Sequence, residues 1–240
     1  MKCIILAAGQ GKRIDQVTKN KPKCLIKINK ETLLERQIKL LNHLKLKKIT
    51  IVKGFMAEKI KFKSVDYVYN KKYKTSEQLE SFFSAKKKLN EDVLVTFGDI
   101  IYELSLVKKL ISSKVGDIIL ATDKNWKKRY KNRYDHPFSQ ADKVKVDNKF
   151  NIINIGKKID PKKSNGEFLG IFKLTKNGCK TFLKNYLRIK KSKKDKMQIH
   201  DFFKYMINRS IKIKACFVNG KFMEIDTMND LKIAKKIFKK

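Results

Sequence analysis

Short apolar runs alternate with longer amphipathic segments along the first half of the chain. The runs, each of a length typical of a buried strand, lie at residues 2–6, 49–52, 65–69, 93–96 and 118–121. The segments whose apolar positions recur at helical spacing lie at residues 31–44, 77–89 and 104–111. This alternation predicts an α/β fold: a Rossmann-like, mostly parallel mixed sheet flanked by helices.

The alternation of strand and helix patterns ends after residue 125. Residues 126–165 hold short alternating runs between turn signals, and they predict a small antiparallel excursion. The later strands are expected at residues 167–174, 211–218 and 222–225, and the later helices at residues 176–187, 199–207 and 227–238. The lysine-rich residues 190–196 are expected to be a mobile loop. Because no Pro- or Ser-rich linker and no repeat interrupts the chain, residues 1–240 are expected to form a single domain.

Composition narrows the class of protein. No apolar run reaches the roughly 18–20 residues that span a bilayer, so we expect a soluble, cytoplasmic protein that does not bind membranes. The four cysteines are far apart without a C-x-x-C pair, which indicates neither a zinc site nor a disulfide framework. The three histidines show no metal-ligand spacing and are expected to be surface or helix residues.

The net charge of +36 has two interpretations. A basic surface of this size attracts nucleic acid or small phosphorylated molecules. The other interpretation is that lysine is simply the common solvent-facing residue of this chain. The scatter of lysine over every segment favours the second interpretation, and a basic nucleic-acid-binding protein is kept as the alternative of another class.

A glycine-rich loop after the first predicted strand is the strongest chemical signal. Gly9 and Gly11 allow backbone N–H groups to approach a phosphate, while Lys12, Arg13 and Lys23 supply cations. The third glycine of a dinucleotide fingerprint and the P-loop pattern are both absent. The loop therefore predicts a cradle for a polyphosphate.

Two carboxylates complement this cradle. Asp99 follows a buried strand, at the end where open α/β sheets place their sites, and Asp226 follows another short apolar run. Two carboxylates together with nucleotide phosphates form the kind of site that Mg²⁺ prefers. The alternative is that Asp226 is an ordinary helix N-cap and Asp99 a turn residue.

The motifs LAAGQGKR, KPK, IVKGF, FGDI and EIDTMNDL follow one another in an order that resembles the nucleotidyltransferase superfamily, which includes the MobA-like NTP transferases. The resemblance covers about residues 2–238. Within it, YKTSEQLESFFSA and GEFLGIFKL are similar to segments of cytidylyltransferases for 2-aminoethylphosphonate and phosphocholine.

The resemblance implies roles for several residues. Leu6, Ala7, Ala8, Gly9 and Gly11 would hold the nucleobase and phosphates. Arg13 and Lys23 would neutralise the triphosphate, and Asp99 and Asp226 would bind Mg²⁺. It assigns no role to Lys12.

Recognition of the base and of the acceptor needs further polar groups. Ser76 and Gln78 are candidates for selecting cytosine, although residues 75–77 also resemble a helix N-cap. An acceptor that carries an amine favours carboxylates or aromatic faces, and residues 126–165 are interpreted as an acceptor-side insertion. The candidates that meet this description are Glu167, Asp135, Trp126 and Tyr130, the last two of which can equally be packing residues.

The sequence thus predicts a Mg²⁺-dependent transfer of a cytidylyl group from CTP to a small phosphonate or phosphomonoester. The first choice of acceptor is 2-aminoethylphosphonate, and a phosphocholine-like compound is the second. Because such an acceptor is already a dianion near neutral pH, it needs positioned cations and no general base. A sugar-1-phosphate nucleotidyltransferase is the alternative enzyme, and a homodimer is a possible assembly.

Overall fold

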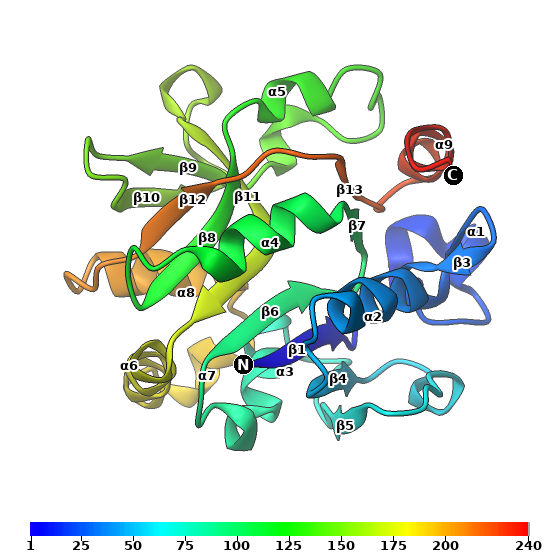
Figure 1. Cartoon of the computed structure of the whole chain (residues 1–240), viewed down its shortest axis with the longest axis horizontal. Helices are drawn as coiled ribbons and strands as arrows, with labels where there is room; N and C mark the ends of the chain where they lie inside the picture. The colour runs from blue at the N-terminus through cyan, green and yellow to red at the C-terminus, as the bar shows by residue number, and fades with distance from the viewer. Residues whose placement is uncertain (240) are drawn as a thin grey trace.

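A mixed sheet forms the centre of the computed structural model, which describes residues 1–239 (Figure 1). In the described chain nine strands belong to this sheet. Seven follow the order β10-β9-β11-β6-β1-β4-β5, while β8 pairs with β11 and with β12. The strands are β1 (Lys2–Ala7), β4 (Ile49–Lys53), β5 (Asp66–Tyr69), β6 (Val93–Phe97), β8 (Ile118–Asp123), β9 (Lys143–Val146), β10 (Ile152–Gly156), β11 (Gly166–Leu174) and β12 (Lys214–Phe217).

The parallel half of the sheet confirms the fold class expected from the sequence. Strand β1 pairs in parallel with β4 on one side and with β6 on the other. Five of its six residues are buried, which agrees with the continuous apolar run from which the strand was predicted. The carboxyl ends of β1 and β6 consequently lie side by side, with the glycine loop following one and Asp99 following the other.

Strand β11 joins the parallel half to the antiparallel part. It pairs with β6 through residues 171–174, with β9 through residues 166–167 and with β8 along its other edge. A register shift falls between Phe168 and Phe172, and Gly170 lies within it at φ +68°. A Cβ at this glycine would approach the ring of Phe97 to 2.7 Å, so only glycine fits where β11 crosses the end of β6.

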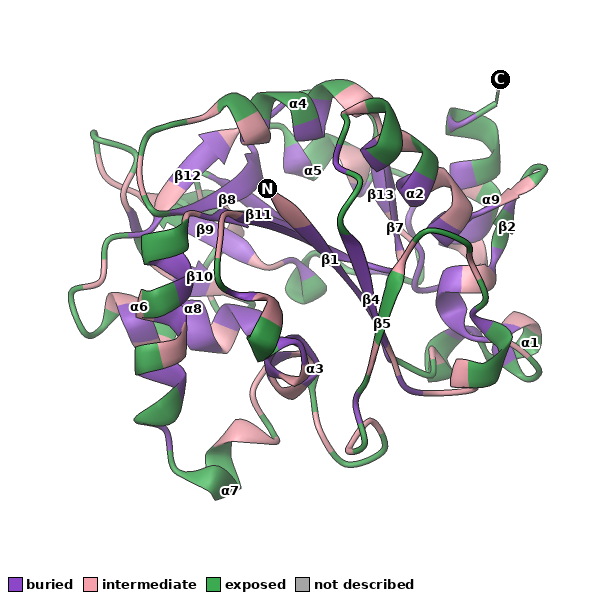
Figure 2. Cartoon of the chain, turned by 60° about the horizontal axis from the view of Figure 1, so that its bottom comes forward, coloured by how far each residue is buried: buried purple, intermediate pink, exposed green. Residues whose placement is uncertain are grey.

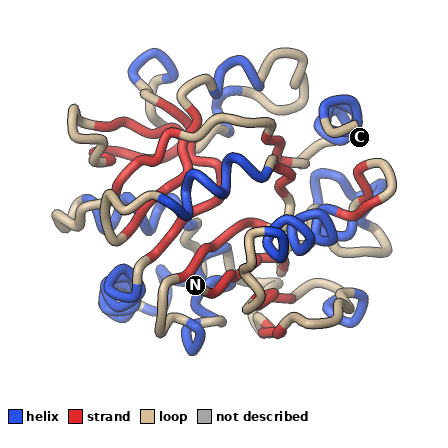
Figure 3. The backbone as a smooth tube through the Cα atoms, viewed as in Figure 1, coloured by secondary structure: helices blue, strands red, loops and turns tan. Residues whose placement is uncertain are grey.

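Two short antiparallel pairs of strands lie outside the main sheet. Figure 3 shows all strands in red and all helices in blue. The two pairs are β2 (Lys27–Ile28) with β3 (Glu31–Thr32), and β7 (Ile100–Tyr102) with β13 (Phe222–Glu224). The sequence patterns had indicated β13 but not β2, β3 or β7. The second pair matters for the site, because it brings residues that are more than a hundred positions apart next to each other.

Helices cover both faces of the sheet. In Figure 2, α2 and α4 lie above the strands while α3, α6 and α8 lie below them. The helices are α1 (Asp15–Thr18), α2 (Leu33–His43), α3 (Gln78–Ser84), α4 (Leu104–Ser112), α5 (Trp126–Arg129), α6 (Lys176–Leu187), α7 (Lys191–Lys194), α8 (Ile199–Ile207) and α9 (Met228–Ile237). No helix among residues 1–239 is long and apolar enough to cross a membrane.

Residues 190–196 differ from the expected mobile loop. They include α7, and Asp195 ties this segment to the chain before α3. Lys72 Nζ lies 2.9 Å from Asp195 Oδ1, and the backbone N–H of Glu77 donates to the Asp195 carbonyl. The run of lysines gave no sign of this contact, because its partner lies 123 positions earlier in the sequence.

Candidate active site

A cavity of about 350 Å³ opens at the carboxyl ends of β1 and β6. One part of its wall is the glycine loop together with Lys23, and a second part consists of the residues around Asp99 and Asp226. A third part, which we call the insertion wall, comes from residues 126–165 and the start of α8. The insertion wall comprises Gln140, Asp142, Lys157, Gln198 and His200.

The glycine loop is fixed by its backbone conformation. Gly11 adopts φ +72°, a left-handed conformation, and a Cβ there would meet the Lys23 side chain at 3.0 Å. The Thr18 hydroxyl donates to the carbonyls of Gly11 and Ile14, at 3.0 Å each, and ties the end of the loop to α1. Gly9, Gly11, Lys12 and Arg13 all line the cavity, as the cradle prediction requires.

Lys23 lies between the two predicted metal ligands. Its Nζ is 2.8 Å from Asp99 Oδ2 and also contacts Asp226 Oδ1, while Arg13 reaches Asp226 Oδ2 at 2.7 Å. The Lys23 side chain is only 10% exposed. Burial alone would lower the pKa of Lys23, but Asp99 and Asp226 raise it, so the ammonium group stays charged.

The turn that carries Asp99 is held from two sides. Buried Gln37, on α2, donates from Nε2 to the carbonyls of Phe97 and Ile100, at 2.9 and 2.8 Å. The Ile225 N–H donates to the Asp99 carbonyl at 3.0 Å, where β13 runs beside β7. This pairing explains why Asp99 and Asp226, which are remote in sequence, face the same cavity.

Glu224 is a third carboxylate of the site, which sequence reasoning did not assign. It lines the cavity, and it lies two positions before Asp226 at the end of β13. Burial, followed by the charges of Asp226 and Asp99, raises the pKa of Glu224. Burial alone would raise the pKa of Asp226 as well, but Lys23 and Arg13 outweigh it and lower that pKa. The period of two along a strand was the signal that could have found Glu224.

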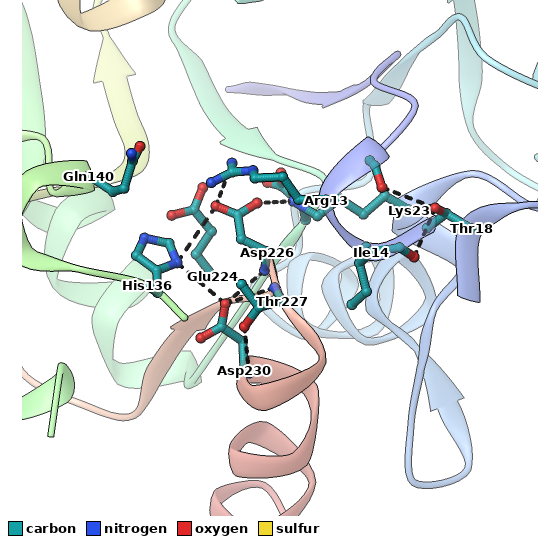
Figure 4. A network of polar contacts seen from close by, with 12 residues as sticks. Arg13, Ile14, Thr18, Lys23, His136, Gln140, Glu224, Asp226, Thr227 and Asp230 are labelled. Atoms are coloured by element: carbon teal, nitrogen blue, oxygen red, sulfur yellow. Dashed lines mark hydrogen bonds and ion pairs between the residues drawn. The ribbon is translucent and has the colours of Figure 1, made fainter. Parts of the chain in front are cut away.

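A buried network of charges supports Asp226 (Figure 4). Asp230 accepts from the backbone N–H groups of Asp226 and Thr227 at 3.0 Å each, and from Arg133 Nε at 2.7 Å. His136 Nδ1 lies 2.9 Å from the Arg133 guanidinium and 3.4 Å from Asp230 Oδ2. Burial alone would raise the pKa of Asp230, but its hydrogen bonds to His136 and Arg133 outweigh burial and lower the pKa. This carboxylate therefore stays ionised.

The same network corrects two expectations. Thr227, and not Asp226, caps α9, because the Thr227 hydroxyl accepts from the Asp230 N–H. The Asp226 carboxylate is therefore directed at Lys23 and Arg13 and does not cap the helix. His136 is buried in the wall of the cavity rather than on the surface, and one ligand atom each of His136, Glu224 and Asp226 lies within 4.8 Å of the others.

A second cavity, of about 140 Å³, adjoins the first and shares five lining residues with it: Gly9, Glu77, Gln78, Phe97 and Asp99. Leu6, Ala8, Tyr73 and Ser76 are among its other lining residues. The structure thus brings Ser76 and Gln78 next to the glycine loop. Ser76 is not the N-cap of α3, since that position is Glu77, and its hydroxyl donates to the Lys72 carbonyl at 2.9 Å.

The four residues expected to bind the acceptor do not line either cavity. Trp126 and Tyr130 are buried against each other, with ring centroids 5.6 Å apart, and Asp135 is exposed. The Tyr130 hydroxyl and Arg129 both donate to the buried carboxylate of Glu167. Packing and internal hydrogen bonds therefore account for Trp126, Tyr130 and Glu167, and the residues of the insertion wall lie beside the cavity in their place.

Comparisons with known proteins agree with this geometry. The family model of the MobA-like NTP transferase domain matches residues 3–143. The chain is 26% identical over 251 residues to a CTP:phosphoglutamine cytidylyltransferase of Campylobacter jejuni, an alignment that covers 97% of this chain and 98% of the relative.

Two solved structures share the fold. One is the CTP:phosphocholine cytidylyltransferase of Streptococcus pneumoniae, with a TM-score of 0.79, 20% identity and 99% of both chains covered. The other is the inositol-1-phosphate CTP transferase of T. maritima, with a TM-score of 0.78 and 23% identity, covering 98% of this chain and 95% of that chain.

Proposed function

This chain belongs to the MobA-like NTP transferase family, and we propose that it transfers a cytidylyl group from CTP to a small phosphorylated or phosphonate acceptor, releasing pyrophosphate. One observation carries the proposal: the glycine loop converges on one cavity with Arg13 and Lys23 and with the carboxylates of Asp99, Glu224 and Asp226. This arrangement suits a reaction in which two anions must be brought together.

The chemistry follows from charge. The acceptor oxygen is a competent nucleophile because a phosphomonoester or phosphonate is mostly dianionic near neutral pH. Arg13 and Lys23 offset the charge of the triphosphate, and Lys23, between the glycine loop and Asp99, can contact both donor and acceptor. Pyrophosphate then leaves in line with the attacking oxygen, with no proton to be removed from the nucleophile.

The carboxylates fit a divalent cation, which we propose to be Mg²⁺. Asp99, Glu224 and Asp226 offer the hard oxygen ligands that Mg²⁺ takes together with phosphate oxygens. When bound, the cation offsets negative charge on the nucleotide. Burial first, and then the charges of Asp226 and Asp99, raise the pKa of Glu224, and a bound cation would offset the charge of all three carboxylates.

Two observations support CTP as the donor. The smaller cavity beside the glycine loop has the Ser76 hydroxyl and the Gln78 amide as groups that can pair with a base edge. The Campylobacter relative, which aligns over nearly its whole length, is named for CTP. The acceptors named for the relatives differ, so 2-aminoethylphosphonate and phosphocholine-like compounds both remain candidate acceptors for this chain.

A pyrophosphate-release screen tests the proposal. The purified chain is given each of four NTPs with Mg²⁺ and one of a panel of acceptors: 2-aminoethylphosphonate, phosphocholine, phosphoethanolamine, phosphoserine and glucose 1-phosphate. Release is expected with CTP and at least one acceptor other than the sugar phosphate, and Asp226→Asn serves as the inactive control. Release with UTP or dTTP and glucose 1-phosphate, but not with CTP, would overturn the cytidylyl assignment.

A further inference from the structure

Beyond the insertion wall lies a third cavity, of about 430 Å³, at the end of β10 and the start of α8. Lys157 and His200 line both this cavity and the main one, so they form the boundary between the two. Three lysines, Lys157, Lys158 and Lys204, line the third cavity, together with one carboxylate, Asp201. A group that extends from the reacting phosphate past the insertion wall would enter this space.

His200 lies between the two carboxylates at the boundary. Its Nδ1 lies 3.0 Å from Asp142 Oδ1, and its Nε2 lies 3.4 Å from Asp201 Oδ1. Burial alone would lower the pKa of His200, but Asp142 and Asp201 raise it, despite the opposing charge of Lys157. Asp201 is further engaged by the backbone N–H of Gln198, which donates to Oδ2 at 3.2 Å. Both carboxylates therefore already lie beside the His200 imidazole.

The lysines at the boundary, in contrast, have no carboxylate in ion-pair contact within the part of the chain that the structure describes. Among residues 1–239, none of Lys157, Lys158 and Lys204 forms an ion pair, and the side chain of Lys157 has one polar contact, at 3.4 Å from Gln140 Oε1. Lysines are abundant throughout this chain, but Lys157 lines the main cavity as well as the third one. The boundary thus presents an excess of positive charge to a bound acceptor.

We propose that Lys157 binds a second anionic group of the acceptor, such as a carboxylate, beside the phosphate or phosphonate that attacks CTP. This inference rests on the proposed function and narrows its substrate class. It differs from the sequence-based expectation, in which carboxylates and aromatic rings held an amine. An ammonium next to an amide side chain suits an anion, because both groups donate hydrogen bonds to it.

Two matched pairs of acceptors test the proposal. Phosphoserine differs from phosphoethanolamine by one carboxylate, and 2-amino-3-phosphonopropionate differs from 2-aminoethylphosphonate in the same way. We measure kcat/KM for each acceptor at saturating CTP and Mg²⁺, with pyrophosphate release as the readout. The acceptor with the carboxylate is expected to be preferred by about tenfold or more within each pair, the usual effect of one charge-assisted hydrogen bond.

Variants separate recognition from folding. Lys157→Ala is expected to lower kcat/KM about tenfold for the acceptors with the carboxylate and to leave the other two within about twofold. Lys145→Ala, at an exposed position of β9 and outside both cavities, is the matched control. Equal kcat/KM within each pair, or an equal loss for both members in Lys157→Ala, would overturn the inference and leave the proposed function standing. No release from CTP with any acceptor would overturn the proposed function, and with it this inference.

Discussion

Lys23 lies between Asp99 and Asp226, the carboxylates that we propose would hold a divalent cation, and its replacement gives a sharp test of that proposal. In Lys23→Met the side chain stays unbranched and loses only its terminal ammonium group in length, so that its charge is lost while most of its apolar stem is kept. The Lys23 side chain is 10% exposed and that of Asp226 is 3% exposed, so the change leaves a buried carboxylate without its main partner. Breaking a buried pair from one side costs about 3–5 kcal/mol.

The expected cost lies at the lower end of this range. Asp99 is 28% exposed, and Arg13 still contacts Asp226 at 2.7 Å. We therefore expect Lys23→Met to lose about 3 kcal/mol of unfolding free energy in the presence of EDTA. A bound cation restores part of the missing positive charge, and a ligand at a hundred times its Kd adds about 2.7 kcal/mol to stability.

Urea unfolding measures this directly. Wild type and Lys23→Met are unfolded in EDTA and in saturating Mg²⁺, with exposed Lys27→Met on β2 as the control. Mg²⁺ is expected to recover most of the loss in Lys23→Met and to stabilise wild type less, since Lys23 already neutralises the carboxylates. A loss of the same size in EDTA and in Mg²⁺ would refute the view that a cation and Lys23 share these ligands.

Three further outcomes are expected. Asp99→Asn and Asp226→Asn should each lower kcat by orders of magnitude while circular dichroism shows the native fold; a variant with near wild-type kcat at saturating Mg²⁺ would remove that residue from the site. The pKa of His200 is raised in the folded protein, so the stability that its protonated form contributes is complete below about pH 6.5 and is lost as the pH rises through the folded-state pKa. His200→Gln should therefore flatten the decline of unfolding free energy between pH 6 and 9. An unchanged dependence of unfolding free energy on pH would contradict the assignment. Tyr130→Phe removes a donor to buried Glu167 and should cost about 1–3 kcal/mol of stability with kcat/KM unchanged for every acceptor, whereas an acceptor-specific loss would return this pair to the site.

The sequence predicted the positions of site residues best where they come directly after a buried strand. The apolar run of β1 and the glycines after it located the loop that lines the main cavity, and the position of Asp99 after β6 placed it at the same edge of the sheet. Glu224 was missed although it lies two positions before Asp226 and lines the same cavity, because the sequence motif drew attention to Asp226 alone.

Contacts between remote segments could not be predicted. Asp142 meets His200 across 58 positions, and the Tyr130 hydroxyl meets Glu167 across 37. The aromatic residues of 126–138 looked suited to an acceptor, but a lone sequence does not show whether such rings face a cavity or one another. Here Trp126, Tyr130 and Phe138 pack together while Tyr134 is exposed. The polar residues of the insertion wall, which lie beside β9 and β10 and at the start of α8, line the cavity in their place.

The identity of the product tests the account most directly. Phosphorus NMR of wild type with CTP, Mg²⁺ and phosphoserine is predicted to show free pyrophosphate together with the two coupled doublets of an unsymmetrical diphosphate, formed as the acceptor signal is lost. Asp226→Asn should leave the spectrum of the starting mixture unchanged. Pyrophosphate accompanied by CMP alone, with every acceptor of the panel intact, would mean that water takes the cytidylyl group and would contradict the account.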